Sequence, residues 1–233
     1  MKYRLVHALR DFFHLVYPNV CITCGNDLFP GEELMCPRCE IDLPKTHFQN
    51  ETGNPVEQIF WGRVPIEQAT SYFYYSKGSR YQRLIHDMKY RGKKWIGYEL
   101  GKRMGTDLFR TPYAEAHKIV PVPLHPKKLR KRGYNQSSWI AKGLSERLDI
   151  PVEHNNLYRK VNTRSQTKKS RFDRWQNVKN VFGIREPDAF SGKHILLIDD
   201  IVTTGATLEA CANRLDEIPG CRISILSLGY SKD

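Results

Sequence analysis

ILLIDDIVTTGATL, residues 195–208, is the stretch of sequence that decides the fold. Its first four residues are apolar without alternation, which is typical of a central parallel strand buried on both faces. Two carboxylates, Asp199 and Asp200, follow at the end of this run. Ligands of open α/β sheets bind outside the carboxyl ends of the strands, so the pattern predicts a parallel sheet with a ligand site at this edge.

The turn after the two carboxylates is rich in hydroxyl groups and contains one glycine: Thr203, Thr204, Gly205, Ala206 and Thr207. Small side chains let backbone N–H groups close around an anion, and a following helix adds its dipole. The turn is therefore a candidate phosphate site, and Asp199 and Asp200 are candidate acceptors for the vicinal hydroxyls of a ribose 5-phosphate. The alternative is an ordinary strand–turn–helix in which one aspartate only caps the helix.

The complete run resembles the signature of the type I phosphoribosyltransferases, which is an apolar strand, two acidic residues and a T-T-G-x-T loop. This resemblance implies phosphoribosyl pyrophosphate as the ligand, bound together with magnesium, and places Asp199 and Asp200 at the catalytic centre. It also implies an α/β fold, with a mostly parallel sheet flanked by helices.

Two C-x2-C pairs stand near the N-terminus: Cys21 with Cys24, and Cys36 with Cys39. A single pair could be a redox pair or a disulfide, but two pairs at this spacing suit the two sides of one tetrahedral zinc ion. Four thiolates leave no open coordination position, so this zinc would be structural. The pattern predicts a small N-terminal zinc-ribbon module.

Predicted strands and helices alternate along the rest of the chain, which favours a parallel sheet. Strands are expected near residues 69–75, 118–123, 195–198 and 222–228, and helices near 79–90, 94–109, 134–148 and 206–216. Shorter strands are expected near Val152 and at 181–184. The predicted domains are an N-terminal helix with a four-cysteine zinc finger (1–45), a polar linker rich in glycine and proline (46–67), and a phosphoribosyltransferase-like domain (68–233).

The formal net charge of +12 is concentrated in the middle of the chain, where residues 61–183 hold 27 Lys and Arg against 9 Asp and Glu. Such asymmetry predicts an anionic partner, and a polyanion uses more of these cations than pyrophosphate does. A solvated basic face is the alternative. No apolar run reaches the ~20 residues that span a bilayer, and residues 5–16 form an amphipathic pattern without a signal-peptide core. We therefore expect a cytoplasmic protein.

Two basic segments are candidates for binding the anion. In VPVPLHPKKLRKRGYNQ, residues 120–136, a strand ends in prolines and a cationic loop follows, with Lys127, Arg130 and Arg132 as candidate ligands of pyrophosphate. The second segment, residues 159–182, contains Arg159 and Arg171 and favours either a lid or an exposed surface for nucleic acid.

Further motifs narrow the resemblance to one family. The paired cysteines, PVPLHPKKLRKRGYNQ (121–136), R-x3-T-x2-Q-x4-R (159–171), RLIHDMKYRG (83–92) and the phosphoribosyl motif together resemble the ComF family. That family implies a role in natural competence, the uptake of DNA as a single strand. It makes Lys89 and Tyr90 candidate pocket residues, and it leaves single-stranded DNA and proteins of the competence machinery open as partners.

Three functions are consistent with the sequence. The preferred one is a DNA-uptake protein with a phosphoribosyltransferase fold that binds phosphoribosyl pyrophosphate. The second is a salvage enzyme that transfers phosphoribose to a nucleobase, although residues 206–233 contain no recognisable segment that would select a base. The third is a non-catalytic regulator that senses phosphoribosyl pyrophosphate.

Overall fold

The computed structural model describes residues 19–160 and 181–231 of the chain. The amphipathic segment 5–16 lies outside the described residues, and so does most of the second basic segment, including Arg171. Within the described ranges, no helix is both long enough and apolar enough to cross a membrane.

The main sheet has four strands in the order β1-β6-β5-β2, and every neighbouring pair is parallel. The strands are β1 (Gln68–Tyr74), β2 (Lys118–Pro121), β5 (His194–Val202) and β6 (Arg222–Tyr230). β5 lies between β6 and β2, and its residues Ile195 and Ile198 are completely buried. The parallel sheet predicted from the apolar run is confirmed, and the buried position of the run explains why it does not alternate.

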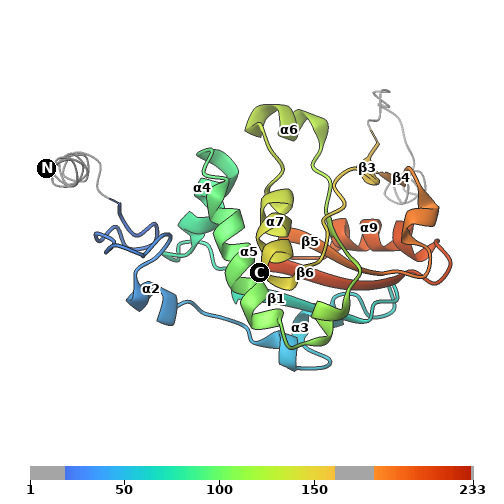
Figure 1. Ribbon diagram of the computed structural model, residues 1–233, viewed down its shortest axis with the longest axis horizontal. Coiled ribbons are helices and arrows are strands. Elements are labelled where there is room, and N and C mark those ends of the chain that lie inside the picture. The colour runs from blue at the N-terminus through green and yellow to red at the C-terminus, as the bar shows by residue number, and fades with distance from the viewer. Residues whose placement is uncertain (1–18, 161–180, 232–233) are drawn as a thin grey trace, which may run out of the picture.

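Helices cover both faces of this sheet (Figure 1). They are α4 (Gln82–Tyr90), α5 (Trp95–Leu108), α7 (Gln136–Leu148) and α9 (Ala206–Asp216). Leu196 of β5 packs with α4, α5 and α7, whereas its neighbour Leu197 packs with α9, because successive strand side chains point to opposite faces. α5 and α7 pack closely, since a Cβ on Gly101 would meet the Ile140 carbonyl oxygen at 2.2 Å.

Strand 181–184 is present as β4 (Phe182–Ile184), but it does not join the main sheet. It pairs antiparallel with β3 (Leu157–Arg159), a strand that the sequence did not predict. The short strand expected near Val152 is a single parallel bridge to Ile119.

Residues 46–67 differ from the polar linker expected from the sequence. They contain α3 (Pro55–Gln58) and bury Phe48, Val56 and Phe60 in the same apolar cluster as β5. A prediction from composition misses these three apolar residues because their neighbours in the sequence are mostly glycine, proline and polar residues. The domain boundaries themselves stay predictions.

The cationic loop expected at residues 127–132 is a helix, α6 (Pro126–Arg132). The His125 side chain accepts a hydrogen bond from the Lys127 backbone N–H, and Pro126 occupies the first turn, where its missing N–H costs nothing. Gly133 ends the helix in the left-handed conformation, with φ of 78°. α4 and α6 project from the same side of the molecule in Figure 1.

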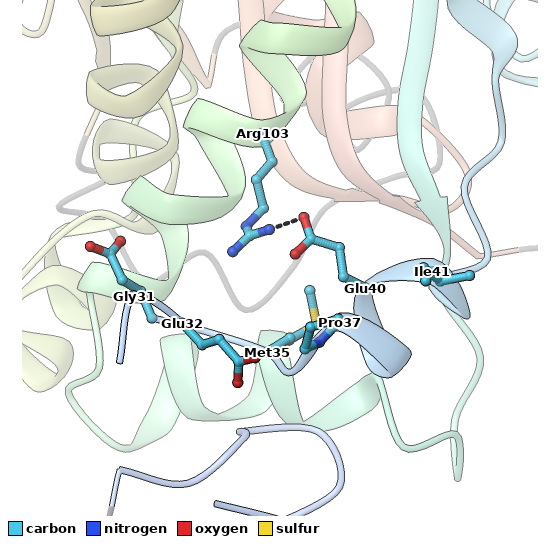
Figure 2. Close-up of a pocket in the computed structure, with 8 residues that line it drawn as sticks. Gly31, Glu32, Met35, Pro37, Glu40, Ile41 and Arg103 are labelled. Atoms are coloured by element: carbon cyan, nitrogen blue, oxygen red, sulfur yellow. Dashed lines mark hydrogen bonds and ion pairs between the residues drawn. The ribbon is translucent and has the colours of Figure 1, made fainter. Parts of the chain in front are cut away.

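The four-cysteine module packs directly on the main domain. Ile22, Leu34 and Met35 are buried in the apolar cluster that includes α4 and α5. Glu40 of α2 (Pro37–Ile41) forms an ion pair with Arg103 of α5, and this pair lies at the wall of a small surface pocket (Figure 2). The module and the sheet therefore share part of one core.

Candidate functional site

The two carboxylates at the end of β5 have different partners. Asp199 Oδ1 accepts hydrogen bonds from Ser137 Oγ at 3.0 Å and from the Asp200 backbone N–H at 2.8 Å. Asp200 Oδ1 forms an ion pair with Lys89 Nζ of α4 at 2.9 Å. Ser137, at the start of α7, was not singled out from the sequence. Three elements therefore meet at these two carboxylates.

The environment raises the pKa of Asp199 to about 7. Burial of the carboxyl group is the main cause and the neighbouring Asp200 charge the second, while the hydrogen bonds from the Asp200 N–H and Ser137 act in the opposite direction. Asp199 thus exchanges its proton near neutral pH, as carboxyl groups in functional sites often do. This shift alone identifies no reaction.

The turn after β5 is exposed and ends at a glycine that caps α9. Thr203, Thr204, Ala206 and Thr207 are exposed, and Gly205 caps α9 with φ of 73°. A Cβ at Gly205 would also lie 2.5 Å from Ile59 Cγ2, so both the backbone conformation and the space require glycine. The first N–H groups of the eleven-residue helix α9 have no partner within the helix, and this helix begins six residues after Asp200.

The Arg63 side chain holds this turn in place through contacts with its backbone and with α9. Arg63 was not singled out from the sequence. Its guanidinium donates to the Thr204 carbonyl oxygen at 2.9 Å and to the Ile59 carbonyl oxygen at 3.0 Å, and it pairs with Glu209 of α9 at 2.7 Å. Arg63 lies within the segment 46–67 that was interpreted as a linker, which is why its role could not be seen. The spacing of Val56, Phe60 and Val64 was the available signal that this segment folds against the sheet.

A cationic pocket lies between α4 and α6, next to the Asp200–Lys89 pair. Its volume is about 380 Å³, and six residues line it: Lys89, Tyr90, Gly92, Lys128, Lys131 and Arg132. Two of the predicted cations, Lys89 and Arg132, therefore meet here. Arg132 also lies over the Tyr90 ring, 5.3 Å from its centroid.

The remaining predicted cations lie elsewhere. Lys127 and Arg130 are exposed on α6 and are not among the residues that line this pocket. Arg159 of β3 lies over the Phe182 ring at 5.4 Å. Burial raises the pKa of Cys211, Asp199 raises it further and Arg159 lowers it, so the Asp199 and Arg159 charges act on the same region of the core. Arg171 lies outside the described residues.

The four N-terminal cysteines meet as predicted. The sulfur atoms of Cys21, Cys24, Cys36 and Cys39 all lie within 4.8 Å of one another, and the Cys24 and Cys36 sulfurs are 3.8 Å apart. Zinc–sulfur bonds of 2.3 Å in a tetrahedron place sulfur atoms about 3.8 Å apart, so the cluster fits this ion. Within the described residues, this is the one group of three or more candidate ligands close enough to share a metal.

No protein-family model matches the chain. Curated proteins do. The chain is 29% identical to Competence protein F of Haemophilus influenzae over 93% of its own length and 92% of that protein. It is 27% identical to DNA utilization protein YhgH of Escherichia coli K12, over 86% of this chain and 92% of the relative. A region of 110 residues is 36% identical to Competence protein ComFC of Bacillus subtilis, covering 47% of this chain and 42% of the relative.

These relatives support the ComF family that the sequence motifs indicate. The alignment with the Haemophilus protein covers 93% of the chain, so it extends over the cysteine module and most of the sheet. The architecture predicted from the sequence is confirmed, namely a mostly parallel sheet flanked by helices with an N-terminal four-cysteine module.

Solved structures resemble this chain more distantly. A glutamine phosphoribosylpyrophosphate amidotransferase from B. subtilis is 21% identical with a TM-score of 0.42, covering 56% of this chain and 25% of that one. A purine phosphoribosyltransferase from Pyrococcus horikoshii is 19% identical with a TM-score of 0.39, covering 58% and 75%.

Proposed function

We propose that this protein binds phosphoribosyl pyrophosphate at the carboxyl end of β5 and acts in DNA uptake during natural competence. One observation carries the ligand assignment: Asp199 and Asp200 lie directly beside an exposed, glycine-capped turn that begins α9. This arrangement offers hydroxyl acceptors and an anion site within one strand–turn–helix, which matches the two ends of a ribose 5-phosphate.

Each part of the proposed site has one task. The backbone N–H groups and hydroxyls of residues 203–207 hold the 5-phosphate, and Asp199 and Asp200 accept hydrogen bonds from the ribose hydroxyls. Lys89, Arg132 and the other cations of the pocket between α4 and α6 face the pyrophosphate. Magnesium would enter with phosphoribosyl pyrophosphate and neutralise part of its charge, with Asp199 and Asp200 as the nearby carboxylates. We therefore expect direct contacts between the ligand and three residues: Asp199, Asp200 and Lys89.

The proposed biological role comes from the relatives and the charge. The names of the relatives concern competence and DNA utilization, and the excess of positive charge in residues 61–183 suits a polyanion. Single-stranded DNA and proteins of the competence machinery are the proposed partners, and the cytoplasm is the proposed location. Structural zinc in the four-cysteine module is part of the same proposal.

A screen for pyrophosphate release distinguishes this function from nucleobase salvage. Each common nucleobase is mixed with protein, magnesium and phosphoribosyl pyrophosphate, and released pyrophosphate is measured beside a direct binding assay for phosphoribosyl pyrophosphate. We expect saturable binding without base-dependent release. Release with one base, abolished in Asp199→Asn, would show a salvage enzyme instead. Absence of binding would contradict the ligand assignment.

A further inference from the structure

A second cationic pocket lies further toward the start of α4, where this helix meets the cysteine module. Its volume is about 400 Å³, and Arg80, Arg83, His86, Asp87, Arg91 and Thr23 are among the residues that line it. The three arginines and His86 come from α4 and the residues next to it, whereas Thr23 comes from between the first two cysteines. The pocket is therefore assembled from two parts of the chain that are far apart in sequence.

This pocket has positive charge that its own acidic residue does not cancel. Asp87 is 1% exposed and is already paired with Lys93 at 3.0 Å and with Arg91 at 3.4 Å. Burial by itself would raise the pKa of Asp87, but the hydrogen bonds from Lys93 and His86 lower it overall, so this carboxylate stays ionised and neutralised by its neighbours. Among the described residues, Arg83 has no carboxylate partner.

Two hydroxyl groups of this pocket lack a hydrogen-bond partner in the part of the chain that the structure describes. Thr23 is 6% exposed, and its Oγ1 is buried without a partner, as is the Oγ of Ser79. Both residues line the pocket. A buried hydroxyl without a partner is costly, so an anion that accepts hydrogen bonds from Thr23 and Ser79 would remove this cost.

Aromatic rings on α4 connect the two pockets. His86 belongs to the pocket at the cysteine module, and Tyr90 belongs to the pocket at α6. Their ring centroids are 5.1 Å apart, and Tyr90 is 63% exposed. With a rise of about 1.5 Å per residue, the six steps from Arg83 to Lys89 extend about 9 Å along the helix. A chain of a few nucleotides is long enough to reach both pockets.

We propose that α4 carries a binding track for single-stranded DNA, which runs from the Arg83 and Thr23 pocket across His86 and Tyr90 to the Lys89 and Arg132 pocket. A DNA phosphate occupies the Arg83 and Thr23 pocket and a base stacks at the exposed Tyr90 ring, while the Lys89 and Arg132 pocket, where the track ends, keeps the pyrophosphate. The track ends at Lys89, the partner of Asp200, so DNA and the ribose phosphate would lie next to each other. This inference rests on the proposed function and assigns a place to its DNA partner.

Single-stranded DNA fits this surface better than the other polyanions. Cations alternate with an exposed ring along one helix, and base stacking on aromatic side chains is how proteins hold single strands without reading their sequence. Paired bases in a duplex do not offer their faces to Tyr90. An acidic polypeptide would match the cations but has no use for the ring.

The test is a binding titration of a fluorescent oligothymidylate of about 16 nucleotides, measured by anisotropy over a range of salt concentrations. The variants are Arg83→Gln and Tyr90→Ala. Tyr90→Phe keeps the ring, and Lys193→Gln removes one exposed cation from the turn before β5, away from α4. Stabilisation of Arg83→Gln by phosphoribosyl pyrophosphate reports that its fold and ribose phosphate site are intact.

We expect Arg83→Gln to make the salt dependence shallower by about 0.7 in log affinity against log salt, the value for one lost phosphate contact on a single strand. Tyr90→Ala should weaken binding at least about 5-fold, whereas Tyr90→Phe and Lys193→Gln should bind like the wild type. Wild-type binding with equal affinity in every variant would overturn the track but leave the proposed function standing. No binding by the wild type would remove the DNA partner from both proposals, and equal competition by polyglutamate would show a surface for acidic polymers instead.

Discussion

Replacing both Asp199 and Asp200 with asparagine should abolish the thermal stabilisation that phosphoribosyl pyrophosphate and magnesium give to this protein. Asparagine keeps the size of each side chain, so the Ser137 hydrogen bond to residue 199 is retained. The substitution removes both negative charges. We expect these two carboxylates to accept hydrogen bonds from the ribose hydroxyls and to lie near magnesium. The double substitution therefore removes ligand contacts while leaving β5 in place.

The size of this effect follows from binding linkage. A ligand at 100 times its Kd stabilises the folded state by about 2.7 kcal/mol, which raises the Tm of a protein of this size by about 5–10 °C. Asp216→Asn is the matched control, because Asp216 is an exposed aspartate at the opposite end of α9 from Gly205. It should keep the full shift. An undiminished shift in the double variant would show that the ligand binds elsewhere.

The same measurement should depend on pH. Because the pKa of Asp199 is raised to about 7, this carboxyl group gains a proton as the pH falls through neutrality. The protonated group is neutral and binds the ribose hydroxyls and magnesium less strongly. We expect the ligand-induced Tm shift to grow between pH 6 and 8 by more than the titration of the ligand's own phosphate explains. A Tm shift that decreases over this range would contradict the role assigned to ionised Asp199.

Loss of the metal should cost more stability than any substitution in the ribose phosphate site. The purified protein should contain about one zinc per chain, and a strong chelator or Cys21→Ser should lower the Tm. Ile22, Leu34 and Met35 of this module are buried against the main domain. Exposing three such side chains costs about 5 kcal/mol, which corresponds to a decrease in Tm of about 10–20 °C.

Cys221→Ser is the control for this experiment. Cys221 is half-buried, lies outside the four-cysteine cluster, and undergoes the same change of one sulfur to oxygen. It should retain the zinc and lower the Tm by only a few degrees. Metal-free protein with an unchanged Tm would show that the four cysteines do not hold a structural ion.

The core of the site was predictable because one short run of sequence contains most of it. Apolar residues, two carboxylates and a glycine-containing turn occur in direct succession, so local patterns define β5, the turn and the start of α9. Lys89 entered only through the family resemblance. Its pairing with Asp200 is a contact between residues more than a hundred positions apart, and such contacts follow from packing and not from local pattern.

The supporting residues were harder to predict. Arg63 acts through its side chain on the Thr204 carbonyl oxygen, and no sequence motif marks a contact of an arginine with a distant backbone atom. Segment 46–67 was interpreted as a linker from its glycine and proline content, although Val56 and Phe60 are four residues apart and completely buried. The glycine and proline content suggested a linker, whereas the four-residue spacing of the apolar side chains correctly indicated a segment that packs on the sheet.

The basic region shows a similar limit. Proline and consecutive cations at 126–132 suggested a loop, but proline in the first turn and a glycine after the last residue are also the signals that begin and end a short helix. β3 was missed because three residues with an arginine at the end carry too little pattern to identify a strand. Prediction of the cationic pockets beside α4 requires the relative positions of α4, α6 and the cysteine module. These positions cannot be read from the sequence.

A crystal structure of the protein with phosphoribosyl pyrophosphate and magnesium tests the central claim most directly. The account predicts that the 5-phosphate lies at residues 203–207, that the ribose hydroxyls lie within hydrogen-bond distance of Asp199 or Asp200, and that the pyrophosphate faces Lys89. A 5-phosphate bound away from the turn, with the two carboxylates free of the ribose, would contradict it.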